Sequence, residues 1–308
     1  MFNKIRSVMI GHAIGDALGV PVEFCSRKYL EKHPVTKMLG FGMHNVPKGT
    51  WSDDTSMSLC ALKSLSNGVV DYDDIMNNFC RWYYNDEFTA TGSVFDVGNT
   101  CANAIATYYD LSCPAEKCGE NDEMSNGNGS LMRIHPFVLY AYYNKMSDDE
   151  FIDMITKASS LTHAHQYSID GCLIYAYVLR ELLNDNSITS IYKGLEKSKD
   201  IISSSKVYDN LLTKDISKER KENIKSSGYV VDSLEAAIWC LLTTKNYSDC
   251  VLKAVNLGVD TDTIAAIAGS LAGALYGFDN IPKTWIEILK REDYIEDICK
   301  DACEIWGW

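Results

Sequence analysis

The sequence predicts an all-α protein. Apolar residues recur at helical spacing along most of the 308 residues, and almost no segment shows the two-residue alternation of a half-buried strand. Runs of β-branched residues are short, and no linker rich in Pro, Ser and Gly divides the chain. We therefore expect a mostly helical fold in a single domain over 1–308.

The composition argues against several classes of protein. Hydrophobic residues make up 46% and charged residues 23%, which is ordinary for a globular protein. The formal net charge of −13 argues against nucleic acid as a partner. The eleven cysteines are scattered and no signal peptide accompanies them, so we expect reduced thiols in a cytoplasmic protein. The most apolar helical run is too short to span a bilayer, so we expect no membrane partner, and a monomer is the working expectation.

The first helix is expected over 5–20. Gly11, Gly15 and Gly19 recur on it every four residues, although each glycine costs roughly 1 kcal/mol relative to alanine inside a helix. Three glycines on one face therefore indicate a close contact with another backbone. Pro21 ends the helix and places Glu23 just beyond it.

Acidic and hydroxyl residues stand at two expected helix starts. A loop over 33–50 leads to a helix that begins near Ser52, Asp53 and Asp54. A second helix, over 264–277, begins behind Asp260, Asp262 and Thr263 and has its own stripe of small residues, which are Ala265, Gly269, Gly273 and Gly277. We expect the two glycine-striped helices to lie deep in one core, where they can pack against each other.

The two groups of acids have two interpretations. Asp, Ser and Thr are ordinary N-cap residues, and acids suit the positive end of a helix dipole. Hard divalent cations also take oxygen ligands, so the two helix starts together could hold one or two Mg²⁺ or Mn²⁺ ions. No EF-hand spacing for calcium is present.

The remaining helices follow from apolar positions at helical spacing. They are expected at 71–84, 100–109, 137–144, 148–160, 168–184, 187–204, 231–243 and 247–257, with one or two more over 284–308.

The loops between these helices contain further candidate residues. Gly127, Asn128 and Gly129 can turn backbone N–H groups toward an anion, or they can form a plain turn. Arg133 can pair with phosphate or hold neighbouring helices together. One of the two histidines around Ala164 can contact phosphate while the other is structural; Tyr229 is a candidate platform for adenine or a core aromatic residue.

Six motifs in this order and spacing resemble the ADP-ribosylglycohydrolase family, in the group that includes dinitrogenase reductase-activating glycohydrolase. The resemblance covers roughly residues 5–278, nearly the whole chain. The motifs are Gly15-Asp16-Ala17-Leu18-Gly19 with Pro21 and Glu23, Trp51-Ser52-Asp53-Asp54-Thr55, Phe95-Asp96-Val97-Gly98, Gly127-Asn128-Gly129 with Met132-Arg133, Thr162-His163-Ala164-His165, and 258–263 with the glycine-striped helix behind it.

The resemblance implies a compact orthogonal bundle of helices with two Mg²⁺ or Mn²⁺ ions at the floor of a cleft. By similarity, the metal ligands would be Ser52, Asp53, Asp54, Asp260, Asp262 and Thr263. Asp96 would be the catalytic carboxylate beside the scissile bond, although a helix cap is its alternative role. Glu23 would be a mobile glutamate that also takes part in catalysis, and its alternative is a solvent-exposed acid. Substrate-binding residues would be Gly127, Asn128, Gly129, Arg133, His163 and Tyr229.

The implied activity is that of a metal-dependent hydrolase that cleaves the glycosidic bond between ADP-ribose and a modified acceptor. The substrate would be an ADP-ribosylated protein or a small ADP-ribosyl compound. Asp96 favours arginine as the acceptor, because a carboxylate can pair with its guanidinium. Two other functions stay open at this stage: a protein that binds ADP-ribose without turnover, and a metal-dependent nucleotide phosphoesterase.

Overall fold

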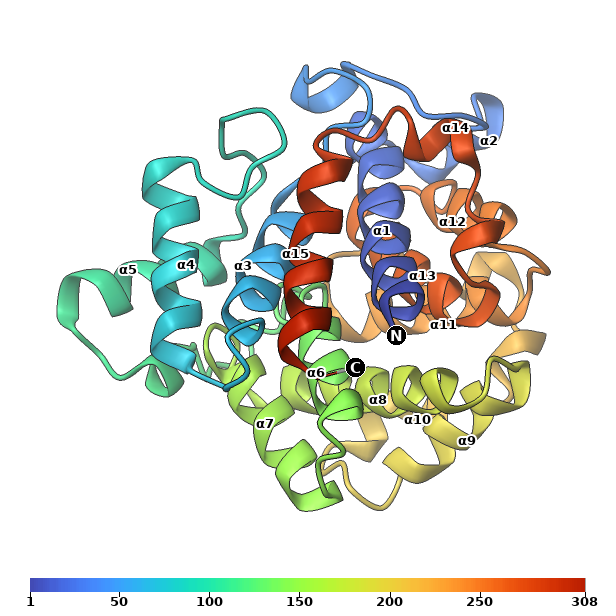
Figure 1. Cartoon of the computed structure of the whole chain (residues 1–308). Helices are drawn as coiled ribbons and strands as arrows, with labels where there is room; N and C mark the ends of the chain where they lie inside the picture. The colour runs from blue at the N-terminus through green and yellow to red at the C-terminus, as the bar shows by residue number, and fades with distance from the viewer. Residues whose placement is uncertain (308) are drawn as a thin grey trace.

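Helices α1 (Phe2–Gly19) and α13 (Thr261–Tyr276) pack against each other at the centre of the structure (Figure 1). The computed structural model describes residues 1–307. A Cβ atom at Gly15 would lie 2.0 Å from the carbonyl oxygen of Ala265, and one at Gly273 would lie 2.0 Å from that of Ser7. The two backbones therefore approach more closely than any side chain allows. The prediction that the two glycine-striped helices share one core is confirmed.

The rest of the chain surrounds this pair with more helices. Residues 1–307 form fifteen α-helices, seven short 3-10 helices and only isolated β-bridges, which confirms the all-α prediction. The other α-helices are α2 (Arg27–Lys32), α3 (Asp53–Leu65), α4 (Tyr72–Asn85), α5 (Asn99–Leu111), α6 (His135–Tyr143), α7 (Asp148–Ser160), α8 (Gln166–Asn184), α9 (Ile188–Ser198), α10 (Asp209–Leu212), α11 (Val230–Leu242), α12 (Tyr247–Val255), α14 (Lys283–Ile286) and α15 (Glu292–Ile305).

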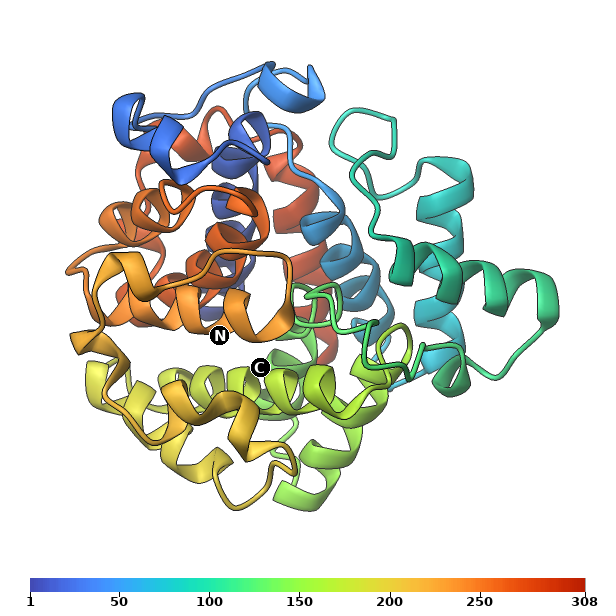
Figure 2. The same cartoon turned by 180° about the vertical axis from the view of Figure 1, so that it is seen from behind.

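The helices cross one another instead of running in one bundle direction. Helix α15 packs against α1 and α3, whereas α8, α11 and α12 pack against α13. Figure 1 shows α8 running across the direction of α1 and α15, and Figure 2 shows the same crossing from behind. This is the orthogonal arrangement that the resemblance implies. Helices α4 and α5 lie at one side, next to α3, and the segment between them carries Asp96.

Most helix positions agree with the sequence, and the differences have local causes. The sequence predicts a helix over 187–204, but the observed helix is shorter. Helix α9 ends at Ser198, and the chain then turns into the 3-10 helix η4 (Ser205–Tyr208). Helix α2 was not expected, since its six residues are too few to show a period. One or two helices are expected over 284–308; the structure has two in this part of the chain, α14 and α15, and Trp308 lies outside the described residues.

Two further expectations concern the environment of the chain. Within residues 1–307, no helix combines the length and the apolar character that crossing a bilayer requires. All eleven cysteines are free thiols, as expected from their scattered positions.

Candidate active site

The N-termini of α3 and α13 meet at the floor of a cavity. Ser52 caps α3, and its hydroxyl lies 3.2 Å from Asp54 Oδ2. From the other helix, the Thr263 hydroxyl donates to the same carboxylate oxygen, also at 3.2 Å. The two acidic helix starts that the sequence predicts are therefore one structural unit.

Asp16 of α1 holds the beginning of α3 in place. Its carboxylate accepts hydrogen bonds from the backbone N–H of Ser52 at 2.9 and 3.0 Å, and from Thr55 N–H at 3.1 Å. The Thr55 hydroxyl adds a third donor at 2.6 Å. On the other side, the Thr261 hydroxyl donates to the carbonyl oxygen of Gly19 at 2.8 Å and ties α13 to α1. The sequence shows Asp16 within a motif but does not reveal this role.

Buried carboxylates form two groups that could hold a cation. Oxygen atoms of Asp16, Asp54 and Asp262 lie within 4.8 Å of one another, and so do oxygen atoms of Glu23, Asp260 and Asp262. Asp54 Oδ1 and Asp262 Oδ2 are buried and have no hydrogen-bond partner within the described residues. All these donors are oxygens, which is the set that Mg²⁺ and Mn²⁺ prefer. The residues present therefore fit a divalent metal.

The pKa values of these acids show the cost of burying them together. Burial raises the pKa of Asp16 to about 7 and that of Asp260 to about 6. Burial, with neighbouring negative charges added, holds the pKa values of Asp53, Asp54 and Asp262 well above the ordinary range. Several buried carboxylates without a nearby cation destabilise the folded state, and a bound cation would offset that cost.

The cavity above this floor has a volume of about 420 Å³, a size typical of small-molecule sites. Nine residues expected at the site line it, and they come from widely separated parts of the chain. They are Glu23, Asp53, Asp96, Gly127, Asn128, Gly129, His163, Asp260 and Thr263. Ser52, Asp54 and Asp262 lie buried behind this wall.

The loop at 127–129 is held against the acids. The Asn128 side-chain amide donates to Asp260 Oδ2 at 2.6 Å and to the Ser233 hydroxyl at 2.8 Å. A Cβ atom at Gly129 would lie 2.7 Å from the Cys101 Sγ atom and 2.9 Å from the His163 ring. Glycine at 129 thus allows both side chains to reach the cavity wall.

The two histidines around Ala164 lie in the loop between α7 and α8 and not on a helix. His163 is buried, its Nδ1 lies 2.8 Å from the Thr162 hydroxyl, and burial lowers its pKa to about 3. His165 caps α8. At neutral pH the imidazole of His163 is therefore uncharged at the cavity.

Two expected substrate-binding residues lie outside the cavity. Arg133 is fully buried, donates to the Thr162 hydroxyl at 2.8 Å and lies over the Phe79 ring at 4.9 Å. This placement matches its alternative role of holding neighbouring elements together. Tyr229 lines an adjoining cavity that also contacts Gly127.

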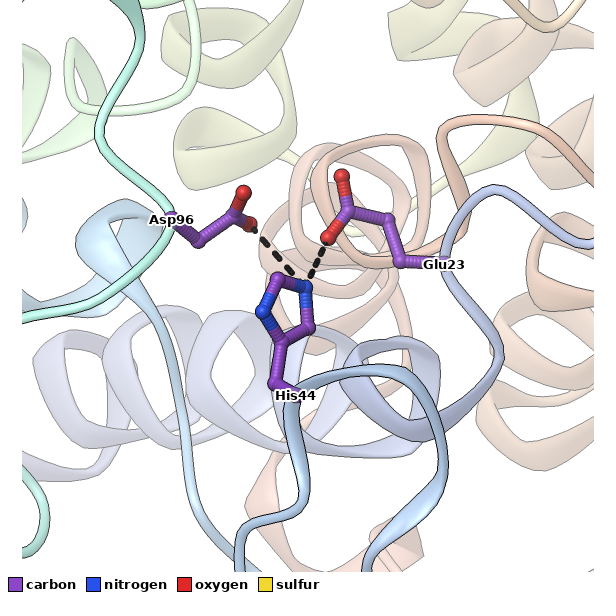
Figure 3. Close-up of side chains that lie close together, drawn as sticks. All are labelled: Glu23, His44 and Asp96. Carbon is purple, nitrogen blue, oxygen red and sulfur yellow. Dashed lines mark hydrogen bonds and ion pairs between the residues drawn. The ribbon is translucent and has the colours of Figure 1, made fainter.

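Glu23, Asp96 and a histidine that the sequence did not single out form a cluster at the cavity mouth. Figure 3 shows the imidazole of His44 pointing between the two carboxylates. His44 Nε2 is hydrogen-bonded to Glu23 Oε2 and lies 3.9 Å from Asp96 Oδ2. Glu23 is only 6% exposed, so it is not the exposed acid of the alternative interpretation. Only the position of His44, in the loop before the motif at 51–55, could have pointed to it.

Electrostatic coupling links the members of this cluster. Burial raises the pKa of Glu23 to about 8, the Asp96 charge adds to the increase, and the bond from His44 opposes it. The hydrogen bond to Glu23 in turn raises the pKa of His44. Glu23 and His44 therefore hold a proton near neutral pH more readily than the isolated groups would.

Three non-glycine residues beside the cavity have left-handed backbones: Phe24, Asp96 and Val259, with φ of 61°, 59° and 70°. Phe24 N–H donates to the Val259 carbonyl at 2.7 Å, and Val259 N–H donates to the Cys25 carbonyl at 2.8 Å. Such conformations persist where the surrounding structure fixes them and are concentrated at functional sites. Phe24 and Val259 here join the segment of Glu23 to the start of α13.

Known proteins resemble this chain in sequence and in fold. The family model described as ADP-ribosylglycohydrolase matches residues 1–307. The chain is 35% identical to the ADP-ribosylarginine hydrolase Tri1 of Serratia proteamaculans (strain 568), covering 97% of this chain and 78% of that protein. It is 30% identical to the ADP-ribosyl-[dinitrogen reductase] glycohydrolase of Rhodospirillum rubrum, covering 93% of this chain and 90% of the relative. A solved "ADP-ribosylglycohydrolase-related protein complex" superposes with a TM-score of 0.83 at 28% identity, covering 99% and 98% of the two chains.

Proposed function

The chain belongs to the ADP-ribosylglycohydrolase family, and on this premise we propose that it is a hydrolase that removes ADP-ribose from arginine side chains of modified proteins. The observation that carries the proposal is the cavity whose floor is built from the acidic starts of α3 and α13 and whose mouth carries Glu23 and Asp96. The name of the Serratia proteamaculans relative, which refers to ADP-ribosylarginine, supports arginine as the acceptor.

We propose that the cavity floor binds two Mg²⁺ or Mn²⁺ ions. The proposed ligands are Ser52, Asp53, Asp54, Asp260, Asp262 and Thr263. The unpartnered oxygens of Asp54 and Asp262 support this assignment, since a bound cation would offset the cost of burying carboxylate oxygens without donors. When bound, such ions would orient the ribose hydroxyls and lower the pKa of a bound water molecule.

The loop at 127–129 is the proposed contact for the diphosphate of ADP-ribose. Its backbone lines the cavity together with the uncharged His163. Tyr229, in the adjoining cavity, is the proposed contact for the adenine ring, which can stack on an aromatic face. Arg133 supports this wall from behind through Thr162, and we assign it no contact with substrate.

Asp96 and Glu23 are the proposed catalytic carboxylates. Hydrolysis breaks the bond between C1 of the distal ribose and a guanidino nitrogen; the hydroxyl of water goes to C1 and a proton goes to the leaving guanidine. Asp96 lines the mouth of the cavity, where it can pair with the guanidinium next to that bond. Glu23 lies closer to the acids of the floor, where its ionised form can accept a proton from the attacking water.

The residues of this site come from both ends of the chain, which supports a single domain over 1–308. Residues from α1, α3 and α13 must come together before the floor exists. The free thiols support the cytoplasm, a reducing compartment, as the location.

The decisive experiment supplies a protein carrying ADP-ribosylated arginine together with Mg²⁺ or Mn²⁺, in parallel with a chelator. We expect free ADP-ribose to appear only with metal. AMP as the product would instead indicate a phosphoesterase, and binding of ADP-ribose without any product would indicate a binding protein.

A further inference from the structure

The geometry points to His44 as a positioning residue that holds the Glu23 carboxylate in the cavity beside Asp96. This inference rests on the proposed function, because it concerns the two carboxylates to which that function gives catalytic roles. His44 itself lines no part of the cavity, so it acts through its neighbours.

The imidazole of His44 lies beside both carboxylates. His44 Nε2 bonds to Glu23 Oε2 and lies 3.9 Å from Asp96 Oδ2 (Figure 3). The side chains of His44, Glu23 and Asp96 are 15%, 7% and 20% exposed, so water screens these contacts only in part. Two carboxylates at the mouth of an already acidic cavity repel each other, and a ring nitrogen between them opposes that repulsion.

The loop that carries His44 is built for this placement. Phe41 N–H donates to the Val46 carbonyl at 2.5 Å and closes the loop, and His44 ends a 3-10 turn within it. Phe41, Gly42 and Asn45 all have positive φ, at 65°, 65° and 53°. Two of these are not glycine, so the surrounding structure maintains a backbone that these residues disfavour.

The same loop docks on the segment that carries Glu23. A Cβ atom at Gly42 would lie 1.9 Å from the carbonyl oxygen of Pro21, so the two backbones are in direct contact. Pro21 stands two residues before Glu23, and Gly42 stands two residues before His44. Contact between the two backbones thus fixes the separation of the two side chains.

Aromatic rings flank the imidazole on the side of each carboxylate. The ring of Phe24 lies 6.2 Å from that of His44, and the ring of Phe95 lies 5.1 Å from it. Phe24 follows Glu23 in the chain and Phe95 precedes Asp96. The chain neighbours of both carboxylates therefore lie near the imidazole that links them, with the closer ring that of Phe95.

The position of His44 predicts which kinetic constant it controls. His44 bonds to Glu23 and lies near Phe95, and it is not among the residues that line the cavity with the loop at 127–129 and His163, so binding of ADP-ribose should not depend on it. The orientation of Glu23 and Asp96 matters for bond cleavage, and small misplacements of catalytic groups reduce turnover strongly.

The test compares His44→Phe, which keeps a flat ring between Phe24 and Phe95 but removes the donor, with His44→Gln, which keeps a donor. The control is His33→Phe, at a histidine that stacks on Tyr29 on the surface and does not line the cavity. Steady-state hydrolysis of an ADP-ribosylated arginine peptide and calorimetric binding of ADP-ribose are measured for each. We expect His44→Phe to lower kcat by about 10- to 100-fold, while KM and the Kd of ADP-ribose change less than about threefold. His44→Gln should recover much of the lost kcat. His33→Phe should match wild type.

Three results would overturn the inference. Wild-type kcat in His44→Phe would remove His44 from the reaction, and equal losses of kcat and ADP-ribose binding in both variants would show a merely structural role. A lower KM at unchanged kcat would mean that His44 occupies the place of the acceptor. If the wild-type protein releases no ADP-ribose, the proposed function is wrong. If the wild-type protein releases ADP-ribose and His44→Phe releases it at the same rate, only the inference about His44 is wrong.

Discussion

The Thr263 hydroxyl donates a hydrogen bond to Asp54 Oδ2 at 3.2 Å across 209 positions of the chain. This bond joins the first turn of α13 to the first turn of α3, so the positive ends of two helix dipoles point at one group of buried acids. The dipoles lower the cost of those negative charges, but two carboxylate oxygens are still without a partner among the described residues. A site of this kind is prepared for a cation.

Metal should stabilise the folded protein, and Asp54 should be required for the effect. We expect Mg²⁺ or Mn²⁺ to raise the melting temperature, because the unfolded chain has no preformed site. At a metal concentration a hundredfold above Kd, binding should add about 2.7 kcal/mol to the free energy of unfolding. In Asp54→Asn the shift should be lost, while the metal-free variant should melt at or above wild type, since one buried charge is gone. Differential scanning fluorimetry with metal and with chelator measures both. Asp301→Asn, on an exposed ion pair with Lys63, is the control and should respond to metal as wild type does.

The metal-free protein should lose stability between pH 6.5 and pH 8. Burial raises the pKa of Asp16 to about 7 and that of Glu23 to about 8 in the folded state. The folded state therefore still binds protons that the unfolded state has released, and this contribution is lost as the pH rises through the folded pKa values. Buried histidines such as His12 and His163, whose folded pKa values are lowered, oppose this trend only near the bottom of the range, because unfolded imidazoles lose their protons near pH 6.5. Urea midpoints measured with chelator should fall across this range; a rise would contradict the raised pKa values.

The helices and the contact of α1 with α13 could be predicted from the sequence, because both have periodic signals. Apolar positions at helical spacing mark the helices, and the four-residue glycine stripes of α1 and α13 indicate their contact. The meeting of the acidic starts of α3 and α13 has no periodic signal, and the sequence suggests it only through the residue types at the two starts and the family resemblance. The short helix α2 and the early end of α9 lack such a period, so they could not be seen.

The role of His44 had no signal in the sequence beyond its position in the loop before the motif at 51–55. It depends on a loop whose positive φ values fall on Phe41 and Asn45 as well as on glycine, and on contact between that loop and Pro21. Arg133 shows the converse limit, since a motif can place an arginine near a phosphate site in sequence while packing directs it to Phe79 and Thr162. Side-chain direction at loops follows from tertiary contacts, which local patterns do not encode.

Asp96→Asn should bind ADP-ribose and lose most of its turnover. Asparagine is nearly isosteric with aspartate and tolerates the positive φ of this position, so the cavity should keep its shape. Removing a catalytic carboxylate typically lowers kcat by about 10²- to 10⁴-fold. Kinetics on ADP-ribosylated arginine and calorimetry with ADP-ribose separate the two effects. Near-normal turnover in this variant would remove Asp96 from the mechanism.

Gly11→Ala and Gly19→Ala should both destabilise the protein, but only the second should weaken metal binding. A Cβ atom at Gly11 would lie 2.6 Å from the carbonyl oxygen of Gly269, far along α13 from the acids. One at Gly19 would lie 2.3 Å from both the N and Cα atoms of Asp262, a proposed metal ligand. Overpacking of this kind costs about 1–3 kcal/mol in either place, and relief of the clash at Gly19 has to move the ligand.

The comparison uses urea unfolding for stability and isothermal titration with Mn²⁺ for affinity. Gly98→Ala is the control for stability, because a Cβ atom there meets nothing within 4 Å. We expect the two variants of α1 to lose similar stability, and Gly19→Ala to bind Mn²⁺ at least about tenfold more weakly, as geometric misplacement of a metal ligand predicts. If both variants bind Mn²⁺ like wild type, the close contact of α1 with α13 serves packing alone. If Gly11→Ala loses as much affinity for Mn²⁺ as Gly19→Ala, the contact of α1 with α13 positions α13 as a rigid unit. A clash anywhere along that contact would then displace the acids, whatever its distance from them.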